Sequence, residues 1–403
     1  MKSALRVAYL ASILVSVALI KMAADVSAPD SSGLTVHEWG TFTSVAGEDG
    51  SAMDWDTLGC KNDLPRFVYD YGYRGFKLRL QGTVRMETPV LFFYAPHPLN
   101  ARVKVSFPQG VITEWYPRAA CQVFRNTGND GSSRPVPANV YAGGTFFQNL
   151  TGGIEWKNVQ VQPGSHPALP VENTPNRYYA ARETDSAPVS VDGQSENFLF
   201  YRGVAQLPVP VCVRISGDGS AVIENRDGKP VPKLVLFENY NSRIGYRTAG
   251  PLQGALTLRA PQLKDSLPAL LDDLQCTLTE QGLFPKEAAA MLNTWKDSWF
   301  EEGSRLIYIV PSAMLQIILP LEIEPAPAHT ARVFVGRIEL ITPETERVVA
   351  SAIANSDAVT LARYGRFLHP ILERLYPQDA RKAGEIERLL RRYELSHGGC
   401  DFR

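Results

Sequence analysis

The sequence predicts an α+β protein in which a mostly β, sandwich-like region precedes a helical C-terminal third. Between residues 34 and 261, short runs of alternating apolar and polar residues are separated by clusters of Gly, Pro, Asn and Asp. This pattern is typical of antiparallel sandwiches with meander or Greek-key connections. From residue 262 onward, leucines recur at helical spacing. With 403 residues, 44% of them hydrophobic, the chain is expected to form two structural units or one unit with large appendages.

The N-terminus has the pattern of a secretory signal peptide. Lys2 and Arg6 precede an apolar run at 7–20, and small residues follow between positions 23 and 28. This run is shorter than the roughly 20 apolar residues that a spanning helix needs. We therefore expect cleavage of residues 1–28 and a periplasmic or secreted mature chain without a membrane span. The alternative is an uncleaved N-terminal anchor in the inner membrane.

The region at 34–261 contains the strongest strand patterns. Residues 90–94 are apolar throughout, which indicates a strand that is covered on both faces. The segment 126–175 is rich in Gly, Pro, Asn and Ser, and it predicts long loops around a hairpin. Further strands are expected at 76–80, 102–107, 111–115, 197–201, 209–215 and 221–224.

The region at 262–403 mixes helices with strands. Leucines from 267 to 278 recur on one helical face, and Gly282 followed by Pro285 predicts a break and a second helix to about residue 300. Strands are expected at 305–311, 316–323 and 331–341, and further helices at 343–375 and 378–395.

Charge and short motifs exclude several classes of function. The chain has 41 Lys and Arg against 42 Asp and Glu, so its net charge of -1 provides no field for nucleic acid or anionic lipid. We therefore expect no nucleic-acid partner. The sequence has no G-x-S-x-G, H-E-x-x-H or Walker motif, and its five cysteines include no C-x-x-C pair. A catalytic site assembled from distant positions remains compatible with these absences.

Residues 36–44 (VHEWGTFTS) form the most unusual run at the start of the mature chain. In a strand, His37 and Trp39 point to one face and Glu38 to the other, so His37 and Glu38 are not an acid–base pair. His37 is a candidate ligand or general base. Alternatively, it is a hydrogen-bonded histidine that helps to fix the first strand.

A short acidic stretch follows this run. Glu48, Asp49, Asp54 and Asp56 lie close together in the sequence, and calcium prefers clustered carboxylate oxygens. Asp54 and Asp56 are therefore candidate metal ligands. Their spacing does not match an EF-hand, and the alternative is a solvated acidic loop.

Arg85 and Glu87 lie on one face of a strand that leads into the apolar run at 90–94. This placement favours a buried or partly buried ion pair. If Glu87 is instead unpaired and desolvated, its pKa rises and it becomes a candidate general acid.

Residues 178–185 (YYAARETD) form another concentration of polar groups. Arg182 is a candidate clamp for a carboxylate or phosphate, because its planar guanidinium binds such groups bidentately. Alternatively, Arg182 pairs with Glu183 or Asp185 in an ordinary surface cluster.

Four segments resemble those of an uncharacterised family of exported bacterial proteins. They are VHEWGTFTS at 36–44, METPVLFFY at 86–94, YYAARETD at 178–185 and VFVGRIEL at 333–340. The resemblance spans most of the mature chain and implies an exported bacterial setting. It implies no activity, cofactor or catalytic residue.

These observations favour an exported protein that binds a ligand or partner in the cell envelope. Aromatic side chains are expected in its cleft, because such rings combine a large contact area with a polar handle. The candidate ligand-binding residues are Trp39, Arg85, Tyr94, Tyr178, Tyr179 and Glu183.

Two other classes of function stay open. One is a hydrolase in which His37, Glu87 and Arg182 converge from different strands as base, acid and anion clamp, with a metal at Asp54 and Asp56. The other is a structural component of envelope assembly, which would present a large exposed apolar patch. The sequence specifies no cofactor.

Overall fold

The structure is a computed structural model that describes residues 33–57, 63–70, 81–126, 133–135 and 150–376, together with 381, 384–386 and 388. The signal peptide expected at 1–28 and the strand expected at 76–80 lie outside the described residues, as does most of the helix expected at 378–395. Within the described ranges, no helix is long and apolar enough to cross a membrane.

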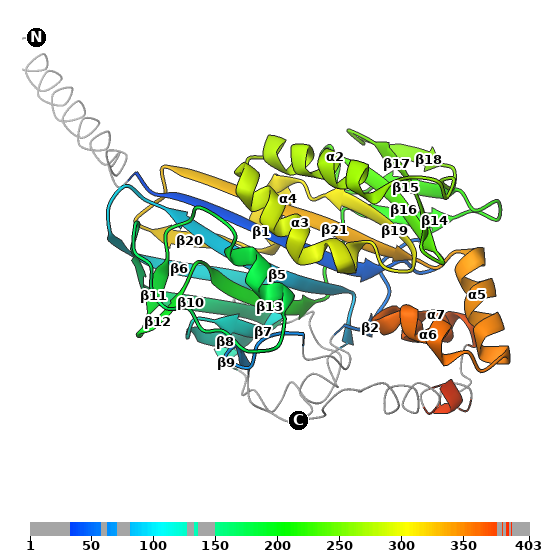
Figure 1. Ribbon diagram of the computed structural model, residues 1–403, viewed down its shortest axis with the longest axis horizontal. Helices are drawn as coiled ribbons and strands as arrows, with labels where there is room; N and C mark the ends of the chain where they lie inside the picture. The colour runs from blue at the N-terminus through cyan, green and yellow to red at the C-terminus, as the bar shows by residue number, and fades with distance from the viewer. Residues whose placement is uncertain are drawn as a thin grey trace, which may run out of the picture.

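The expected α+β class is confirmed, since the chain is rich in strands and its helices are mostly C-terminal (Figure 1). Among the described residues, nine strands form one mixed sheet in the order β17-β16-β19-β21-β1-β5-β13-β7-β3. Their bounds are β1 Thr35–Val45, β3 Tyr69–Asp70, β5 Val84–Tyr94, β7 Gly110–Tyr116, β13 Leu199–Ala205, β16 Leu234–Tyr240, β17 Arg243–Ala249, β19 Gly303–Ile309 and β21 His329–Leu340.

A second sheet packs against one face of the first and makes the fold sandwich-like. Its order is β12-β11-β10-β6-β20, with β8 paired to β10 and β9 paired to β8. Its bounds are β6 Leu99–Pro108, β8 Ala120–Asn126, β9 Ser133–Pro135, β10 Leu150–Val161, β11 Val189–Val191, β12 Gln194–Glu196 and β20 Leu321–Glu324. The smaller groups are β14 Val211–Ile215, β15 Ala221–Asn225 and β18 Ala255–Leu258, and the pair β2 Trp55–Asp56 with β4 Gln81–Gly82.

The central strand β1 joins the two halves of the chain. It pairs in parallel with β21 and antiparallel with β5. Because β19 and β21 lie between β16 and β1, strands from the region 262–403 complete the sheet that the region 34–261 begins. The two sequence regions therefore share one sheet.

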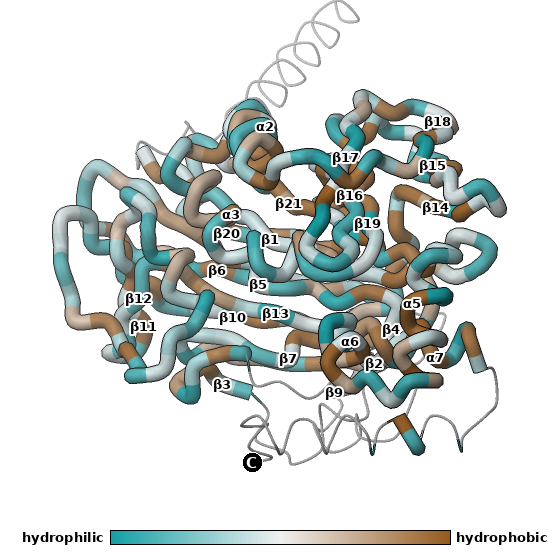
Figure 2. The backbone as a smooth tube through the Cα atoms, turned by 45° about the vertical axis from the view of Figure 1, so that its right-hand side comes forward, coloured by the Kyte–Doolittle hydropathy of each residue, from teal (hydrophilic) through white to brown (hydrophobic). Residues whose placement is uncertain are grey.

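The two faces of the nine-stranded sheet bury different side chains. Along β1, Val36 and Phe42 enter the core between the two sheets. Trp39 points the opposite way and packs in a second core with α2 (Leu267–Glu280) and α3 (Pro285–Trp299). The same period of two appears in β6, where buried and partly exposed residues alternate. Figure 2 shows the hydropathy of the residues changing along the backbone.

The helix boundaries follow local sequence signals. Gly282 lies between α2 and α3 with a φ of 112°, a backbone conformation that suits glycine. Pro285 opens α3, where its missing N–H costs no hydrogen bond. The side chain of Glu287 then accepts a hydrogen bond from the Phe284 backbone N–H at 2.8 Å, which satisfies one of the free donors at the helix start.

One segment differs from expectation. The strand expected at 316–323 is replaced by α4 (Ser312–Ile318) and the short β20, because a short apolar run does not distinguish a strand from a buried helix. Within the segment 126–175, residues 127–132 and 136–149 lie outside the described residues, and the described part contains the 12-residue strand β10. Its Gly152 serves close packing rather than a turn, since a Cβ there would lie 2.6 Å from the carbonyl oxygen of Gly110.

A helical module closes the end of the sheet where β1 and β21 finish. It comprises α5 (Pro343–Ala354), α6 (Ala358–Arg363), η5 (Gly365–Phe367) and α7 (Leu368–Leu375). Its apolar residues form a third core with Val45, Trp55 and Ile341, and Figure 1 shows it beside β2. This packing brings Arg366 of η5 to the large sheet.

Candidate functional site

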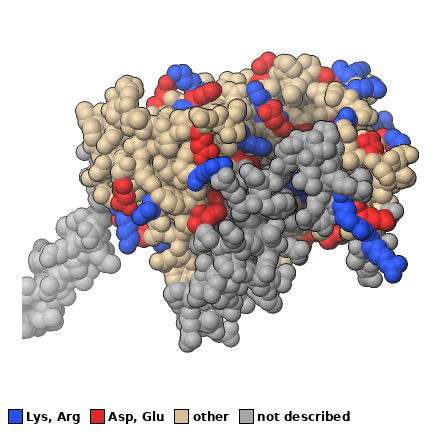
Figure 3. Space-filling model, turned by 60° about the horizontal axis from the view of Figure 1, so that its bottom comes forward, with Lys and Arg blue, Asp and Glu red and all other residues tan. Residues whose placement is uncertain are grey.

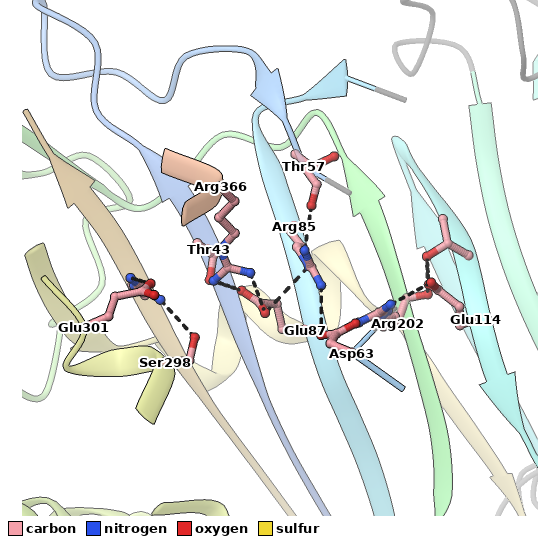
Figure 4. Close-up of polar contacts among 12 residues, drawn as sticks. Thr43, Thr57, Asp63, Arg85, Glu87, Glu114, Arg202, Ser298, Glu301 and Arg366 are labelled. Carbon is pink, nitrogen blue, oxygen red and sulfur yellow. Dashed lines mark hydrogen bonds and ion pairs between the residues drawn. The ribbon is translucent and has the colours of Figure 1, made fainter. Parts of the chain in front are cut away.

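The concentrated charge of this protein lies inside it. On the face shown in Figure 3, basic and acidic side chains are interspersed, but a row of charged side chains also crosses the nine-stranded sheet beside the helical module. The row spans the neighbouring strands β7, β13, β5, β1, β21 and β19, with Thr43 as the contribution of β1. Figure 4 shows part of it, from Glu114 to Glu301. We call it the charged row, and its members are Asp63, Arg85, Glu87, Glu114, Arg202, Glu301, Arg305, Arg337, Glu339 and Arg366.

A bulge in β5 places charged and apolar side chains on the same face of the sheet. Arg85, Glu87 and Val90 all face the same side of the sheet. In a regular strand, Glu87 and Val90 would face opposite sides, because they are three positions apart. The pairing register with β1 shifts at this point, and Thr88 has a φ of 43°. A β-branched residue rarely adopts this conformation, which costs about 1 to 3 kcal/mol and is concentrated at functional sites. The Thr88 hydroxyl is also buried without a hydrogen bond.

Glu87 is the centre of the first group in the row. Its carboxylate accepts a hydrogen bond from Thr43 Oγ1 at 2.6 Å and one from Arg366 Nη1 at 3.0 Å. Arg85 Nε lies 3.6 Å from Glu87 Oε2, so the ion pair expected from the sequence forms. Burial raises the pKa of Glu87, but Arg366 and Arg85 outweigh it and hold the pKa below its usual range. Glu87 is therefore ionised at neutral pH and is not a general acid.

Arg202 links two carboxylates on the other side of Arg85. Its Nη1 lies 2.8 Å from Asp63 Oδ1 and its Nη2 lies 2.7 Å from Glu114 Oε1. Asp63 Oδ2 also accepts a bond from Arg85 Nη2 at 3.4 Å. Burial raises the pKa of Asp63, but the charges of Arg202 and Arg85 outweigh it and lower the pKa overall. Asp63 is consequently a permanent anion held by two guanidinium groups.

The remaining part of the row supports the end of α3. Arg305 donates hydrogen bonds to the carbonyl oxygens of Trp299 at 3.1 Å, Glu301 at 2.5 Å and Glu302 at 2.7 Å. A cation that satisfies the last carbonyls of a helix stabilises its C-terminus. Arg337 pairs with Glu301 at 2.6 Å and with Glu339 at 3.2 Å. This half of the row therefore has a clear structural role.

The charged row contains more donors than its own acceptors satisfy. The Nε atoms of Arg85, Arg202 and Arg337 are buried and have no hydrogen bond in the described part of the chain. Its guanidinium groups offer about five N–H donors each, whereas each carboxylate offers about four acceptor positions. Thr43 and Ser298 add further hydroxyl groups. Such a site is suited to a group that brings additional oxygen acceptors.

His37 lies at the other end of β1 in a separate network. Its Nδ1 is 2.7 Å from Glu287 Oε2, and Tyr94 donates its hydroxyl proton to Glu287 Oε1 at 2.8 Å. His37 pairs in register with Phe92, which is five residues from Glu87 and hence roughly 16 Å away along the strand. The two candidate catalytic residues do not converge.

Arg182 belongs to a third network. It binds Glu196 bidentately, at 2.9 Å from Nε and 2.7 Å from Nη2, and it also donates to the Pro170 carbonyl oxygen. Its guanidinium stacks over the Tyr179 ring at 4.8 Å. The partner is thus Glu196 rather than the neighbouring Glu183 or Asp185. A structural partner occupies the anion-binding edge of Arg182.

The expected aromatic cleft does not form around Trp39 and Tyr178. These side chains are 0% and 1% exposed and belong to the core under α2 and α3. Trp39 enters this core from β1, and Tyr178 enters it from the 3-10 helix η4 (Arg177–Arg182). Tyr94 and Tyr179 are half-buried, and their hydroxyl groups bond Glu287 and the Glu172 backbone N–H. Of the expected binding residues, Arg85 alone lies in the charged row, and Glu183 is a weak acceptor for Asn293 at 3.5 Å.

The structure offers no support for a metal at the acidic stretch. Asp54 is exposed, and the side chain of Asp56 lies outside the described residues. Among the residues that the structure describes, no group of three or more His, Cys, Asp or Glu side chains could hold a metal ion.

Several members of the charged row do not stand out in the sequence. Glu114 and Arg202 carry one signal, since each is the single charged residue of its strand, whereas Arg337 shares its strand with Arg332 and Glu339. Asp63 and Arg366 carry no such signal in the sequence, because neither of them belongs to a strand of the sheet. In comparisons with known proteins, no family model and no curated protein sequence matches this chain.

Proposed function

We propose that this protein is an exported ligand-binding protein of the bacterial cell envelope, and that the charged row binds the anionic group of its ligand. The observation that carries this proposal is a set of buried guanidinium donors without a hydrogen bond among the described residues, Nε of Arg202 and Nε of Arg337, to which Arg85 adds an Nε that lies 3.6 Å from Glu87 Oε2. Buried donors are nearly always satisfied in folded proteins, so an incomplete set in a fixed frame favours an external acceptor.

The charge states favour binding over proton transfer. The pKa values of Asp63, Glu87 and Glu301 are all lowered, because nearby arginines outweigh the effect of burial. Groups that hold fixed charges near neutral pH are poor general acids or bases. Fixed charges are well suited to orienting a ligand through charge-assisted hydrogen bonds.

The sequence supports the setting of this proposal. The N-terminal pattern at 1–28 is that of a signal peptide. Three of the four segments that resemble exported bacterial proteins also contribute to the row or its hydrogen bonds, through Thr43, Glu87 and Arg337. The proposed site and the resemblance thus rest partly on the same residues.

Calorimetric titration of the mature chain with citrate and with inorganic phosphate at low ionic strength tests the proposal. We expect binding of at least one probe. Arg202→Lys should lower the affinity for it roughly tenfold or more, because the ammonium group of lysine cannot replace the two hydrogen bonds of a planar guanidinium. The matched control is Arg182→Lys, which removes another bidentate arginine outside the row and should leave the affinity unchanged. Absence of binding in the wild type, or equal losses in both variants, would contradict the proposal.

A second candidate is hydrolysis at His37. The specific observation is that the buried Glu287 holds the imidazole through Nδ1, the arrangement by which a carboxylate orients a catalytic base. This candidate site does not include Glu87 or Arg182, which the hydrolase expected from the sequence combines with His37. Turnover of ester or glycoside substrates that disappears in His37→Gln, but persists in Arg202→Lys, would favour this candidate over the charged row.

A further inference from the structure

We propose that Asp63 is an internal substitute for the ligand, and that the ligand binds by placing a carboxylate where the Asp63 side chain lies. This inference rests on the proposed function of the charged row and specifies its chemistry. The anionic group is a carboxylate, and its seat is the space between Arg85 and Arg202.

The geometry of Asp63 is that of a bound carboxylate. Its two oxygens are shared between two arginines, at 2.8 Å from Arg202 Nη1 and 3.4 Å from Arg85 Nη2. The second contact is long for a charge-assisted hydrogen bond, for which about 2.7 to 2.9 Å is usual. Asp63 therefore occupies the seat without filling both arginine forks.

The other carboxylates of this group are held more deeply. Glu87 and Glu114 project from strands of the sheet, and the side chain of each is 2% exposed. Asp63 precedes a short loop, and its side chain is 19% exposed. Its backbone carbonyl is held by Asn176 at 3.1 Å, and the next residue, Leu64, is buried. The backbone is thus anchored, and rotation of the side chain alone would vacate the seat.

Charge balance explains why a carboxylate would be accepted in its place. Among the described residues in ion-pair contact, Arg85, Arg202 and Arg366 oppose Asp63, Glu87 and Glu114, so three positive charges meet three negative ones there. Without Asp63, one positive charge is uncompensated in a buried site, which is strongly unfavourable. An incoming carboxylate restores this balance.

The decisive variant is Asp63→Asn, which keeps the side-chain shape and removes its charge. We expect it to bind citrate at least tenfold more tightly than the wild type, because the internal competitor is gone. Acetate should also bind more tightly to this variant than to the wild type. The affinity for inorganic phosphate should rise less, if the seat is shaped for a carboxylate. Glu196→Gln is the matched control: it also removes a buried carboxylate from an arginine, Arg182, but outside the charged row, and should leave the affinity unchanged.

The outcomes separate this inference from the proposed function. If the wild type binds citrate and Arg202→Lys loses it, but Asp63→Asn gains nothing, the row binds anions and Asp63 is not a substitute. If the wild type binds no probe, the proposed function itself fails. A larger gain for phosphate than for citrate would overturn the assignment of a carboxylate.

A second measurement covers the case in which Asp63→Asn does not fold. A crystal structure of the wild-type protein grown in citrate should show a citrate carboxylate between Arg85 and Arg202, with the Asp63 side chain turned away. Citrate bound elsewhere, or Asp63 still bridging both arginines at saturating citrate, would overturn the inference.

Discussion

The same face of the large sheet is apolar at one end and charged at the other. Under α2 and α3 it buries Trp39, Val90 and Phe92, whereas beside the helical module it buries Glu87 and Arg202. The first end stabilises the fold by removing apolar surface from water. The second contributes little net stability, since desolvation offsets most of the attraction between buried charges. This difference is expected if the charged end serves the anion binding that we propose rather than the stability of the fold.

Truncation in the apolar end should have the largest effect on stability. Trp39→Ala removes a fully buried indole, and such changes cost about 3 to 5 kcal/mol of unfolding free energy. Urea denaturation followed by circular dichroism measures the loss. A cost below 1 kcal/mol would show that this end is not the main source of stability.

Breaking the charged end should cost nearly as much for a different reason. Glu87→Gln leaves Arg85 and Arg366 without their common anion, and removal of one partner from a buried pair costs about 3 kcal/mol or more. The pKa of Glu87 is lowered in the folded state, so its contribution is present above the unfolded pKa of about 4.3. It is lost as the pH falls through the folded pKa. The variant should therefore lose less stability than the wild type between neutral pH and pH 3, as measured by acid titration of the melting temperature.

Glu238 provides the opposite case, a buried carboxylate without an arginine in hydrogen-bond contact. Burial raises its pKa to about 7, and the hydrogen bond from Ser304 only partly offsets this effect. Its stabilising contribution is fully present below the unfolded pKa and is lost as the pH rises through about 7. Glu238→Gln should thus stabilise the protein at pH 8 by on the order of 2 kcal/mol and change little at pH 4. Equal effects at both pH values would show that its burial does not control its charge.

Surface pairs should have the smallest effect. Lys104 and Glu322 lie 2.8 Å apart on neighbouring strands, but both side chains are exposed. Solvent and salt screen such pairs. Lys104→Ala should leave the melting temperature unchanged within error. A marked loss would indicate that exposed pairs, and not only the two buried ends, determine stability.

The fold class was predictable because it depends on local periodicity, whereas the site depends on long-range contacts. The leucines at 267–278 and the Pro285 start signal define α2 and α3 in the sequence alone. The ion pair of Arg85 with Glu87 was also predictable, because the two residues are separated by one position in a strand.

The rest of the site was not predictable for the same physical reason. Arg366 reaches Glu87 across 279 positions of the chain, and Arg202 reaches Asp63 across 139. His37 was identified as a candidate base, but its partner Glu287 lies 250 positions away on α3. Trp39 gave a misleading signal, because a large aromatic residue serves a core as well as a cleft.

The pairing of β1 with β21 has a consequence for how the chain acquires its structure. Residues 35–45 emerge first during synthesis, but their parallel partner at 329–340 emerges near the end, and the bond between Glu38 and Arg332 spans 294 positions. Folding dominated by such distant contacts is slow. The edge of β1 that pairs with β21 therefore stays unpaired until residues 329–340 are available. Truncated chains that end before residue 329 should be targets for proteases and holding chaperones.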